Sequence, residues 1–495
     1  MKKLAISKNG RYLIRPDGTP FPWIADTGWT VPSRLKWDDV LHYLKVRKQE
    51  GFTVLQMVVL DPEFNPEMKN PCGIKALRNG KLDQRNEEYF AYIDWVLDEA
   101  EKLGFYILLL PVWGQLVVGE DWSGNTYEKT VREDNAFEYG RWLGKREAAR
   151  PNVLWCLGGD RMPVHNGTDY RKVWRELAEG LAFGLTGKKL SWNQNHEEWK
   201  KLMLTYHPCH ERETGECSTF SYWTDEEAWI SFIMLQSGHG ITPKNYELIQ
   251  KEYERTNAMP VWDGEPAYEA MPTEWPITPE TKFHGPDIVR KRAYGSIFAG
   301  AFGYTYGHAS VWCTVSEKER NELARYTWTE ALMSEGAHQM KILRDFLETF
   351  PAESYYPCQK ALIEQSRNPD RLADHRQACI SRDRRILLVY FYRKVIESLD
   401  LQQLLEQRGP QESIRYAWFN PADGTVSRTQ TITDENLSGG IWKVHFPEDE
   451  GDGDRVLIIA VTDAEEEKRN TGITVVSGSY YQISRNENQR KVFDW

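Results

Sequence analysis

The sequence predicts an α/β protein, a (β/α)8 barrel followed by a smaller C-terminal β-sandwich. Over residues 21–350, strand-like runs alternate with amphipathic helical patterns, which is typical of a parallel sheet with crossover helices. After residue 350 the pattern becomes purely β. A length of 495 residues also exceeds what one hydrophobic core usually supports, so more than one domain is expected.

The first 20 residues are expected to form a β-hairpin that caps the barrel. Pro16-Asp17-Gly18 lies between apolar flanks, and this combination favours a tight turn.

The barrel itself is predicted from eight strand-like runs within residues 21–350. One intervening helix is expected over 86–103, with one apolar face, an Asn86 cap and an end at Gly104. A long helical region over 316–350 completes the barrel. The eight predicted strands are 21–29, 53–60, 106–113, 152–160, 201–208, 229–239, 260–269 and 301–312.

The C-terminal part is predicted to be a β-sandwich over residues 351–463. Its strands are separated by turn residues, which is the usual pattern of antiparallel sheets. Residues 464–495 form a tail of uncertain structure. The expected strands are 386–392, 413–419, 441–446 and 455–461.

Composition limits the classes of partner. With 62 basic and 73 acidic side chains the formal charge is −11, which argues against nucleic acid or an anionic membrane. Aromatic residues make up 13% of the chain, and their flat faces suit the C–H surfaces of sugars. A neutral small molecule is therefore the expected partner, while the oligomeric state stays open.

The cellular compartment is expected to be the cytoplasm. Only three apolar residues follow the basic N-terminus before polar ones return, so no signal peptide is expected, and no run is long enough to span a membrane. The seven cysteines are scattered and odd in number, which suggests free thiols.

Two carboxylates stand where predicted strands end, and they are the catalytic candidates. Asp160 ends the run Val153-Leu-Trp-Cys-Leu-Gly-Gly-Asp160, and Glu265 follows Val261-Trp-Asp-Gly. Active sites of barrels lie at the C-terminal ends of the strands, and a carboxylate pair there is the apparatus of a glycoside hydrolase. Polar and aromatic residues near other strand ends are the candidate substrate contacts: Asp26, Trp29, His207, Trp223, Gln236, His239, Tyr268, Glu269, His308 and Trp312.

Each of these candidates has a structural alternative. Asp160 could cap a helix, and Asp263 or Glu269 could be the acid instead of Glu265. Asp26 could bind a turn, while the histidines and tryptophans could be structural or core residues.

Metal binding is not expected, and neither is a cofactor. His207-Pro-Cys-His210 with Cys217 has zinc-compatible ligand types, but the spacing matches no established zinc pattern. There is no phosphate-binding glycine loop and no Ser-His-Asp elbow.

The chain resembles the apiosidase-like proteins of glycoside hydrolase family 140 from about residue 8 to 350. The resemblance implies an exo-acting glycosidase that removes a terminal β-D-apiose from plant glycans or glycosides. It also implies a catalytic pair formed by Asp160 and Glu265; we assign Glu265 as nucleophile and Asp160 as general acid/base, and expect retention. The motifs that carry the resemblance are Gly10-Arg-Tyr-Leu13, Asp26-Thr-Gly-Trp29, Leu157-Gly-Gly-Asp160, Tyr206-His-Pro208, Gln236-Ser-Gly-His239, Asp263-Gly-Glu-Pro266 and Gly300-Ala-Phe-Gly-Tyr-Thr-Tyr-Gly-His308.

Two other functions remain open from the sequence. The same barrel and chemistry could serve another sugar, as in a xylosidase, an arabinosidase or a glucanase, because loops decide pocket shape. A carbohydrate-binding protein without catalysis is the second alternative, against which the two intact acids argue.

Overall fold

A closed barrel forms the larger part of the molecule. The computed structural model describes residues 1–121, 123–211, 214–241, 244–367, 372–447, 451–463, 474–476 and 480–482. Within these residues eight parallel strands form one sheet in the order β10-β11-β12-β3-β4-β5-β6-β9. Ser231 N donates to Leu204 O at 2.8 Å between the two end strands, which closes the sheet. The strands are β3 Trp23–Thr27, β4 Val54–Val58, β5 Tyr106–Leu110, β6 Val153–Gly158, β9 Leu204–His207, β10 Ile233–Leu235, β11 Val261–Asp263 and β12 Gly303–Tyr306.

All eight predicted barrel strands are confirmed, although each is shorter than its apolar run. The extra residues at the C-terminal end of several runs form the turns and loops of one barrel face. The run 201–208 also began too early, because Lys201 and Leu202 end helix α7 (Glu197–Leu202) and Met203 takes a left-handed conformation before β9.

Helices cover the outside of the barrel. Helix α3 (Glu87–Lys102) confirms the prediction, and Gly104 follows it with φ +79°. Asn86 makes no side-chain capping bond, so that part of the prediction was wrong. The predicted helical region 316–350 is helical in three segments: the 3-10 helix Glu317–Glu319, α10 (Trp328–Ala331) and α11 (Glu335–Thr349). The other helices used below are α1 Val31–Arg34, α2 Trp37–Gln49, α4 Gln115–Val118, α5 Ala136–Glu147, α6 Arg171–Thr186, α8 Asn245–Tyr253 and α9 Pro286–Phe298.

The N-terminal segment packs under the end of the barrel opposite the strand-end motifs. Strand β1 (Ala5–Ile6) pairs with β2 (Leu13–Ile14), a pairing not anticipated from the sequence. The expected turn is present, because Arg15 N donates to Thr19 O at 3.0 Å. Leu4 and Leu13 share one apolar cluster with Trp23, Phe232 and Phe302.

The C-terminal part is an antiparallel β domain, as predicted. A six-stranded sheet has the order β13-β14-β15-β21-β17-β18, and a three-stranded sheet has the order β16-β20-β19. The four predicted strands correspond to β15, β17, β20 and β21. Most of 464–495 lies outside the described residues; within it, β22 (Thr474–Val476) pairs with β23 (Tyr480–Gln482). The strands are β13 Tyr355–Pro357, β14 Arg376–Ser381, β15 Ile386–Phe391, β16 Ser398–Asp400, β17 Glu412–Phe419, β18 Gln430–Ile432, β19 Leu437–Ser438, β20 Ile441–Lys443 and β21 Arg455–Asp463.

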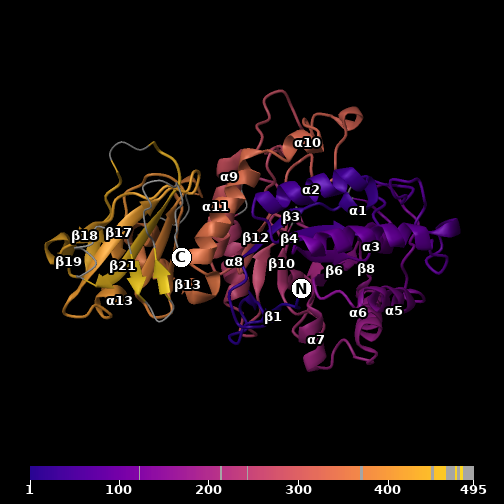
Figure 1. Cartoon of the computed structure of the whole chain (residues 1–495), viewed down its shortest axis with the longest axis horizontal. Helices are drawn as coiled ribbons and strands as arrows, with labels where there is room; N and C mark the ends of the chain where they lie inside the picture. Colours follow the sequence, from indigo (N-terminus) through magenta and orange to yellow (C-terminus); the bar gives the residue numbers. More distant parts are fainter. Residues whose placement is uncertain are drawn as a thin grey trace.

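Barrel and β domain share one continuous core. Figure 1 shows α9 and α11 standing between the two parts. The ring of Tyr294 on α9 stacks on Tyr390 of β15 at 5.1 Å, and Phe346 on α11 lies 5.0 Å from Phe419 of β17. These rings belong to the same buried cluster as the outer barrel core, so the two parts are packed as one body.

Candidate active site

A strained turn presents Asp160 at the end of β6. Gly158, Gly159 and Asp160 have φ values of +90°, +103° and +53°. A Cβ at position 158 would lie 2.4 Å from His207 O, and one at 159 would lie 2.8 Å from the Trp113 ring. Only glycine fits both places, so the Gly-Gly pair lets the chain pass this crowded point and places Asp160 beyond the C-terminal end of β6.

The Asp160 carboxylate is held by two side chains. Gln236, which follows β10, donates from Nε2 to Asp160 Oδ1 at 2.9 Å. The buried Arg161 lies 3.2 Å from Oδ2. The carboxylate keeps 13% of its side-chain surface exposed, so a substrate can reach it. Gln236 Oε1 in turn accepts from His210 N at 2.6 Å, which fixes the amide.

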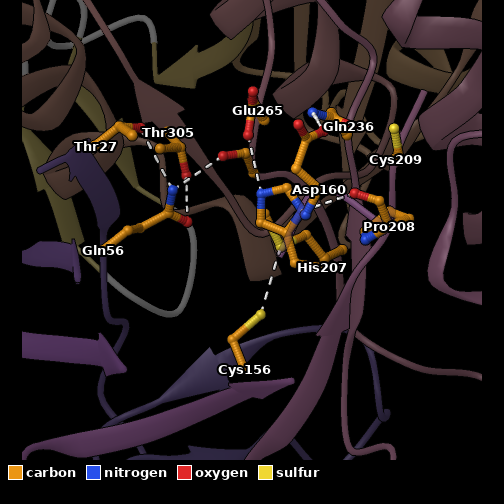
Figure 2. A network of polar contacts seen from close by, with 12 residues as sticks. Thr27, Gln56, Cys156, Asp160, His207, Pro208, Cys209, Gln236, Glu265 and Thr305 are labelled. Carbon is orange, nitrogen blue, oxygen red and sulfur yellow. Dashed lines mark hydrogen bonds and ion pairs between the residues drawn. The ribbon is translucent and has the colours of Figure 1, made fainter. Parts of the chain in front are cut away.

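Glu265 follows β11 on the same barrel face. Gln56 on β4 donates to Gly264 O at 3.0 Å across the barrel interior, which anchors the residue before Glu265. Gly264 itself has no room for a side chain, because a Cβ would lie 2.4 Å from Met234. Figure 2 shows Glu265, Asp160 and His207 gathered at this point, with Gln56 to their left.

Two imidazoles hold the Glu265 carboxylate. His207 Nε2 lies 2.9 Å from Oε2, and His239 Nε2 lies 3.3 Å from Oε1. The other ring nitrogen of each histidine faces a carbonyl oxygen, Pro208 O at 2.7 Å and Pro266 O at 3.0 Å. Asp160 N also lies near His207 Nδ1, at 3.3 Å, but the shorter contact is to Pro208, so we assign a proton to that nitrogen.

These contacts set the charge of Glu265. Burial alone would raise its pKa, but hydrogen bonds and charge from His207 and His239 outweigh burial and hold the pKa well below the usual range. For His207, burial alone would lower the pKa, yet the hydrogen bond and charge of Glu265 raise it. Each group of the pair therefore favours the charged form of the other.

Aromatic rings line the site behind the histidine. Trp29 lies 5.5 Å and Trp113 lies 5.7 Å from the His207 ring, and the two indoles are 5.4 Å apart. Tyr268 packs on His239 at 4.4 Å, and its buried hydroxyl faces Thr27 and Trp29. The structure thus brings together seven of the expected residues: Trp29, Asp160, His207, Gln236, His239, Glu265 and Tyr268.

Asp26 does not contact the residues around the two acids, contrary to expectation. Its side chain is fully buried and pairs with Arg47 of α2 at 2.7 Å, while Tyr43 donates to it at 2.6 Å. The carboxylate therefore faces the helix layer, and Asp26 is a structural anchor of α2 and not a sugar ligand.

Glu269 is likewise part of the scaffold, and His308 is held through one of its two ring nitrogens. Glu269 accepts from Tyr306 at 2.6 Å and from Gly336 N, at the start of α11, at 3.1 Å. His308 accepts from Ser310 N at 3.0 Å, and burial lowers its pKa to about 3. The Glu269 carboxylate already binds the protein, so that expectation is corrected. Of the His308 ring only Nδ1 is bound in this way, and its contact with a substrate stays a prediction.

The tryptophans divide between core and rim. Trp223 is buried, edge-on to Tyr206 at 5.3 Å and to Trp229 at 5.2 Å, in the layer outside the barrel, so its expected place in the pocket wall was wrong. Trp312 is half-buried and contacts Phe64 at 4.5 Å, where the loops after β4 and β12 meet.

The acid alternatives can now be compared. Asp263 is fully buried and accepts from Ser237 Oγ at 2.6 Å, and burial raises its pKa to about 6. Glu269 is bound as described above. Of these three acids, Glu265 alone has two histidine partners among the described residues.

Three residues of the site were missed. Arg161 contacts the Asp160 carboxylate, and Gln56 anchors Gly264 next to Glu265. The signal for Arg161 was its place beside Asp160. Glu63 lies in the loop after β4, where Leu60-Asp-Pro-Glu63 ends a predicted strand in acids. This is the same signal that located the other site residues.

The zinc alternative finds no support in the geometry. Among the described residues no group of three or more His, Cys, Asp or Glu side chains could hold a metal ion. His207 faces Glu265 and Pro208 instead. All seven cysteines are unpaired.

The comparisons with known proteins identify the family of the chain and support its fold. The family model described as the catalytic domain of apiosidase-like proteins matches residues 7–354. This chain belongs to the apiosidase-like family. A solved structure described as a glycoside hydrolase is 27% identical, with a TM-score of 0.74 over 93% of this chain and 97% of that one. A family 5 glycoside hydrolase from Bacteroides vulgatus is 26% identical, with a TM-score of 0.75 over 97% and 95% of the two chains.

The apiosidase-like chain is a glycoside hydrolase on these grounds. A search of curated proteins found no match. Among the described residues there is no helix with the length and apolar character needed to cross a bilayer.

Proposed function

We propose that this apiosidase-like protein removes a terminal β-D-apiose, or a similar pentose, from plant glycosides or oligosaccharides. Glu265 acts as nucleophile and Asp160 as general acid/base, with retention of configuration. The observation that carries this proposal is the ionised Glu265 between two imidazoles, with Asp160 presented beside it at the same barrel face.

Each step of the proposed reaction has a residue suited to it. Asp160 gives a proton to the glycosidic oxygen as Glu265 attacks the anomeric carbon, and the aglycone leaves. Asp160 then takes a proton from water, whose oxygen displaces Glu265 and releases the sugar. Retention requires carboxyl groups about 5 to 5.5 Å apart, whereas about 6.5 to 9.5 Å would favour inversion.

We also propose which residues contact the sugar. Gln236, His239 and Tyr268 carry polar atoms beside the two acids, and Trp29 and Trp312 offer aromatic faces. Polar groups that fix hydroxyls and rings that pack on C–H surfaces are the usual elements of a sugar subsite.

For the C-terminal β domain we propose a β-sandwich that acts as a structural partner of the barrel. Apolar residues of both antiparallel sheets share one cluster, including Leu399 and Trp442 from one sheet and Leu387 and Leu457 from the other.

The test is sugar release from an apiosylated flavonoid glycoside, compared with its xylosyl, arabinosyl and glucosyl analogues. Wild type, Asp160→Ala and Glu265→Gln are assayed in parallel. We expect apiose release by the wild type, reduced by a factor of about 1,000 or more in both variants, since each acid acts in the chemical step.

Other outcomes are equally informative. Release of another sugar alone would keep the mechanism and replace the substrate. Equal binding of a glycoside by wild type and Glu265→Gln, without release by either, would instead indicate a carbohydrate-binding protein.

A further inference from the structure

The places of the two acids on the barrel set the direction in which a substrate lies. Asp160 follows β6 and Glu265 follows β11, and β12 is the neighbour of β11. In the closed order of eight strands, four steps separate β12 from β6, so these two strands lie on opposite sides of the barrel. A general acid protonates the oxygen of the leaving group. Under the proposed function the aglycone therefore extends past Asp160, and the released sugar lies on the side of β12, β3 and β4.

Two loops meet on that side of the barrel. Phe64, in the loop after β4, packs edge-on against Trp312, in the loop after β12, with the ring centroids 4.5 Å apart. Trp312 also packs against the apolar cluster that holds Trp29 and Trp113 and against the one that holds Tyr268. The pair of rings, called the Phe64–Trp312 wall below, therefore borders the site residues on the sugar side.

Hydrogen bonds fix both members of the wall. The Trp312 indole donates from Nε1 to Ala309 O at 3.0 Å. Next to Phe64, Glu63 Oε2 accepts from Trp113 Nε1 at 2.6 Å, which ties the loop after β4 to the aromatic lining of the site. An apolar cluster supports the two rings: Cys313, Val315 and Ala324.

Arg34 of α1 clamps the two loops together. Its Nη1 donates to Phe64 O at 2.6 Å, and its Nε donates to Thr314 Oγ1 at 3.2 Å. Its Nη2 forms an ion pair with Glu319, whose other carboxylate oxygen accepts from Ser316 N at 2.9 Å. A guanidinium presents its donors in a fixed planar fork, so one side chain holds both loops in one relative position.

The loop after β12 is also held at its far end. The Arg325 guanidinium lies 3.4 Å from the centroid of the Phe283 ring, in the loop after β11. Leu323 packs against the cluster that holds Tyr268. Residues 307–327 thus run from the loop after β4 to the loop after β11, and they are fixed at both.

We propose that the Phe64–Trp312 wall, clamped by Arg34, ends the sugar side of the site after one residue, so that the protein accepts only glycosides whose released sugar carries no further sugar. This inference rests on the proposed function and names the residues that make its action strictly terminal. A second sugar on that side would have to displace an aromatic contact held at both ends, and such a clash is how a site rejects a competing substrate. Phe64 and Trp312 exclude by their volume, while Arg34 is a positioning residue that acts through them.

The kinetic test compares two aryl glycosides with the same leaving group. One is the β-D-apioside, and the other is this apioside extended by one β-xylosyl residue at each hydroxyl group in turn. If the release assay identifies another sugar, the pair is built on that sugar. The ratio of kcat/KM for the extended over the unextended glycoside measures the exclusion. A general loss of stability lowers both rates alike and leaves this ratio unchanged.

For the wild type we expect a ratio below about one hundredth, rising at least about tenfold in Trp312→Ala at one or more of the linkage positions. Phe64→Ala repeats the test from the other side of the ring contact. Arg34→Met should raise the ratio about threefold or more, and Arg34→Lys, which keeps the charge but not the fork, should fall between it and the wild type. Arg141→Met, on the exposed surface of α5, is the matched control and should leave the ratio unchanged. A wild-type ratio near one, or an unchanged ratio in Trp312→Ala or Arg34→Met, would overturn the proposal.

A second measurement needs no turnover. Isothermal titration calorimetry follows binding of the same two glycosides to Glu265→Gln, with and without the additional Trp312→Ala change. We expect the extended glycoside to bind much more weakly than the unextended one while the wall is intact, and the two affinities to converge once Trp312 is removed. Equal affinities with the wall intact would overturn the proposal. A wild type that releases no sugar would refute the proposed function, while the binding comparison would still decide this inference.

Discussion

At the scale of single residues, the proposed reaction depends on where protons reside. His207 and Glu265 form a buried pair in which each stabilises the charged form of the other. The raised pKa of His207 adds to the free energy of unfolding at pH values below the ordinary histidine pKa. This contribution is lost as the pH rises through the raised pKa of His207. The Glu265 contribution is present above its ordinary pKa and lost as pH falls toward the lowered one. The pair is therefore most stabilising between about pH 4.3 and pH 6.5, where both ordinary values lie.

His207→Gln tests this coupling. Removal of the positive charge leaves burial as the dominant influence on Glu265, which raises its pKa. Since Glu265 must be ionised to attack, we expect the acid limb of kcat/KM to move to higher pH by roughly one to three units. The assay uses an aryl glycoside with a good leaving group, and circular dichroism checks folding at each pH.

His338→Gln on α11 is the matched control, because that imidazole is exposed and remote from the acids. It should leave the acid limb where it is. An acid limb at the same pH in His207→Gln and wild type would contradict the charge coupling.

The role of a single residue could be predicted from the sequence only where its place next to a strand end was enough to locate it. Asp160 and Glu265 follow strands directly, so the motifs locate both. Asp26 lies within a strand, where alternate side chains face opposite layers, and the register that turns it toward Arg47 depends on the whole sheet. The His207–Glu265 contact joins residues 58 positions apart and has no local signal.

At the scale of elements, the turn after β6 decides whether Asp160 reaches the cleft. The positive φ of Gly159 and its contact with Trp113 are separate constraints, and each can be probed by adding one methyl group.

Gly159→Ala is expected to impair both stability and activity. The left-handed conformation costs about 1 to 2 kcal/mol for a residue with a side chain, and overpacking against Trp113 adds about 1 to 3 kcal/mol. Displacement of Asp160 should also lower kcat/KM at least about tenfold. Urea denaturation and steady-state kinetics measure the two effects.

Gly167→Ala separates the two causes. Gly167 also has a positive φ, +74°, but nothing lies within 4 Å of its added Cβ. It should lose only the conformational part of the free energy of unfolding and keep its activity. Equal losses in both variants would show that the Trp113 contact is unimportant.

The strands of the barrel were more predictable from the sequence than the strands of the β domain. Barrel strands are buried on both faces, so each appears in the sequence as a continuous apolar run. Such a run can be recognised without knowing which strands are its neighbours. Strand β14, Arg376–Ser381, was missed because it mixes polar and small residues. Its place between β13 and β15 comes from tertiary packing.

At the scale of the whole molecule, a buried ion pair joins barrel and β domain. Arg290 on α9 contacts Asp454 at 2.7 and 3.0 Å, and Tyr390 donates to the same carboxylate at 2.7 Å. The sequence separation of 164 residues hides this contact from any local pattern. Only the presence of two domains could be inferred beforehand.

Asp454→Asn should destabilise the whole chain. It leaves the Arg290 charge buried without a carboxylate, which costs about 3 kcal/mol of the free energy of unfolding. Glu138→Gln breaks an exposed pair with Arg141 and should cost less than about 1 kcal/mol. Urea denaturation measures both; similar small losses would mean that the interface does not depend on this pair.

The most direct test of the central claim is to trap the covalent intermediate. Asp160→Ala is mixed with an aryl apioside bearing a good leaving group, quenched in acid, digested with pepsin and analysed by mass spectrometry. We predict a mass increment of one anhydropentose on the peptide that contains Glu265, because the first step no longer needs the acid while the second step lacks its base. An adduct on another residue, or turnover with inverted configuration and no adduct, would contradict the assignment of Glu265 as nucleophile.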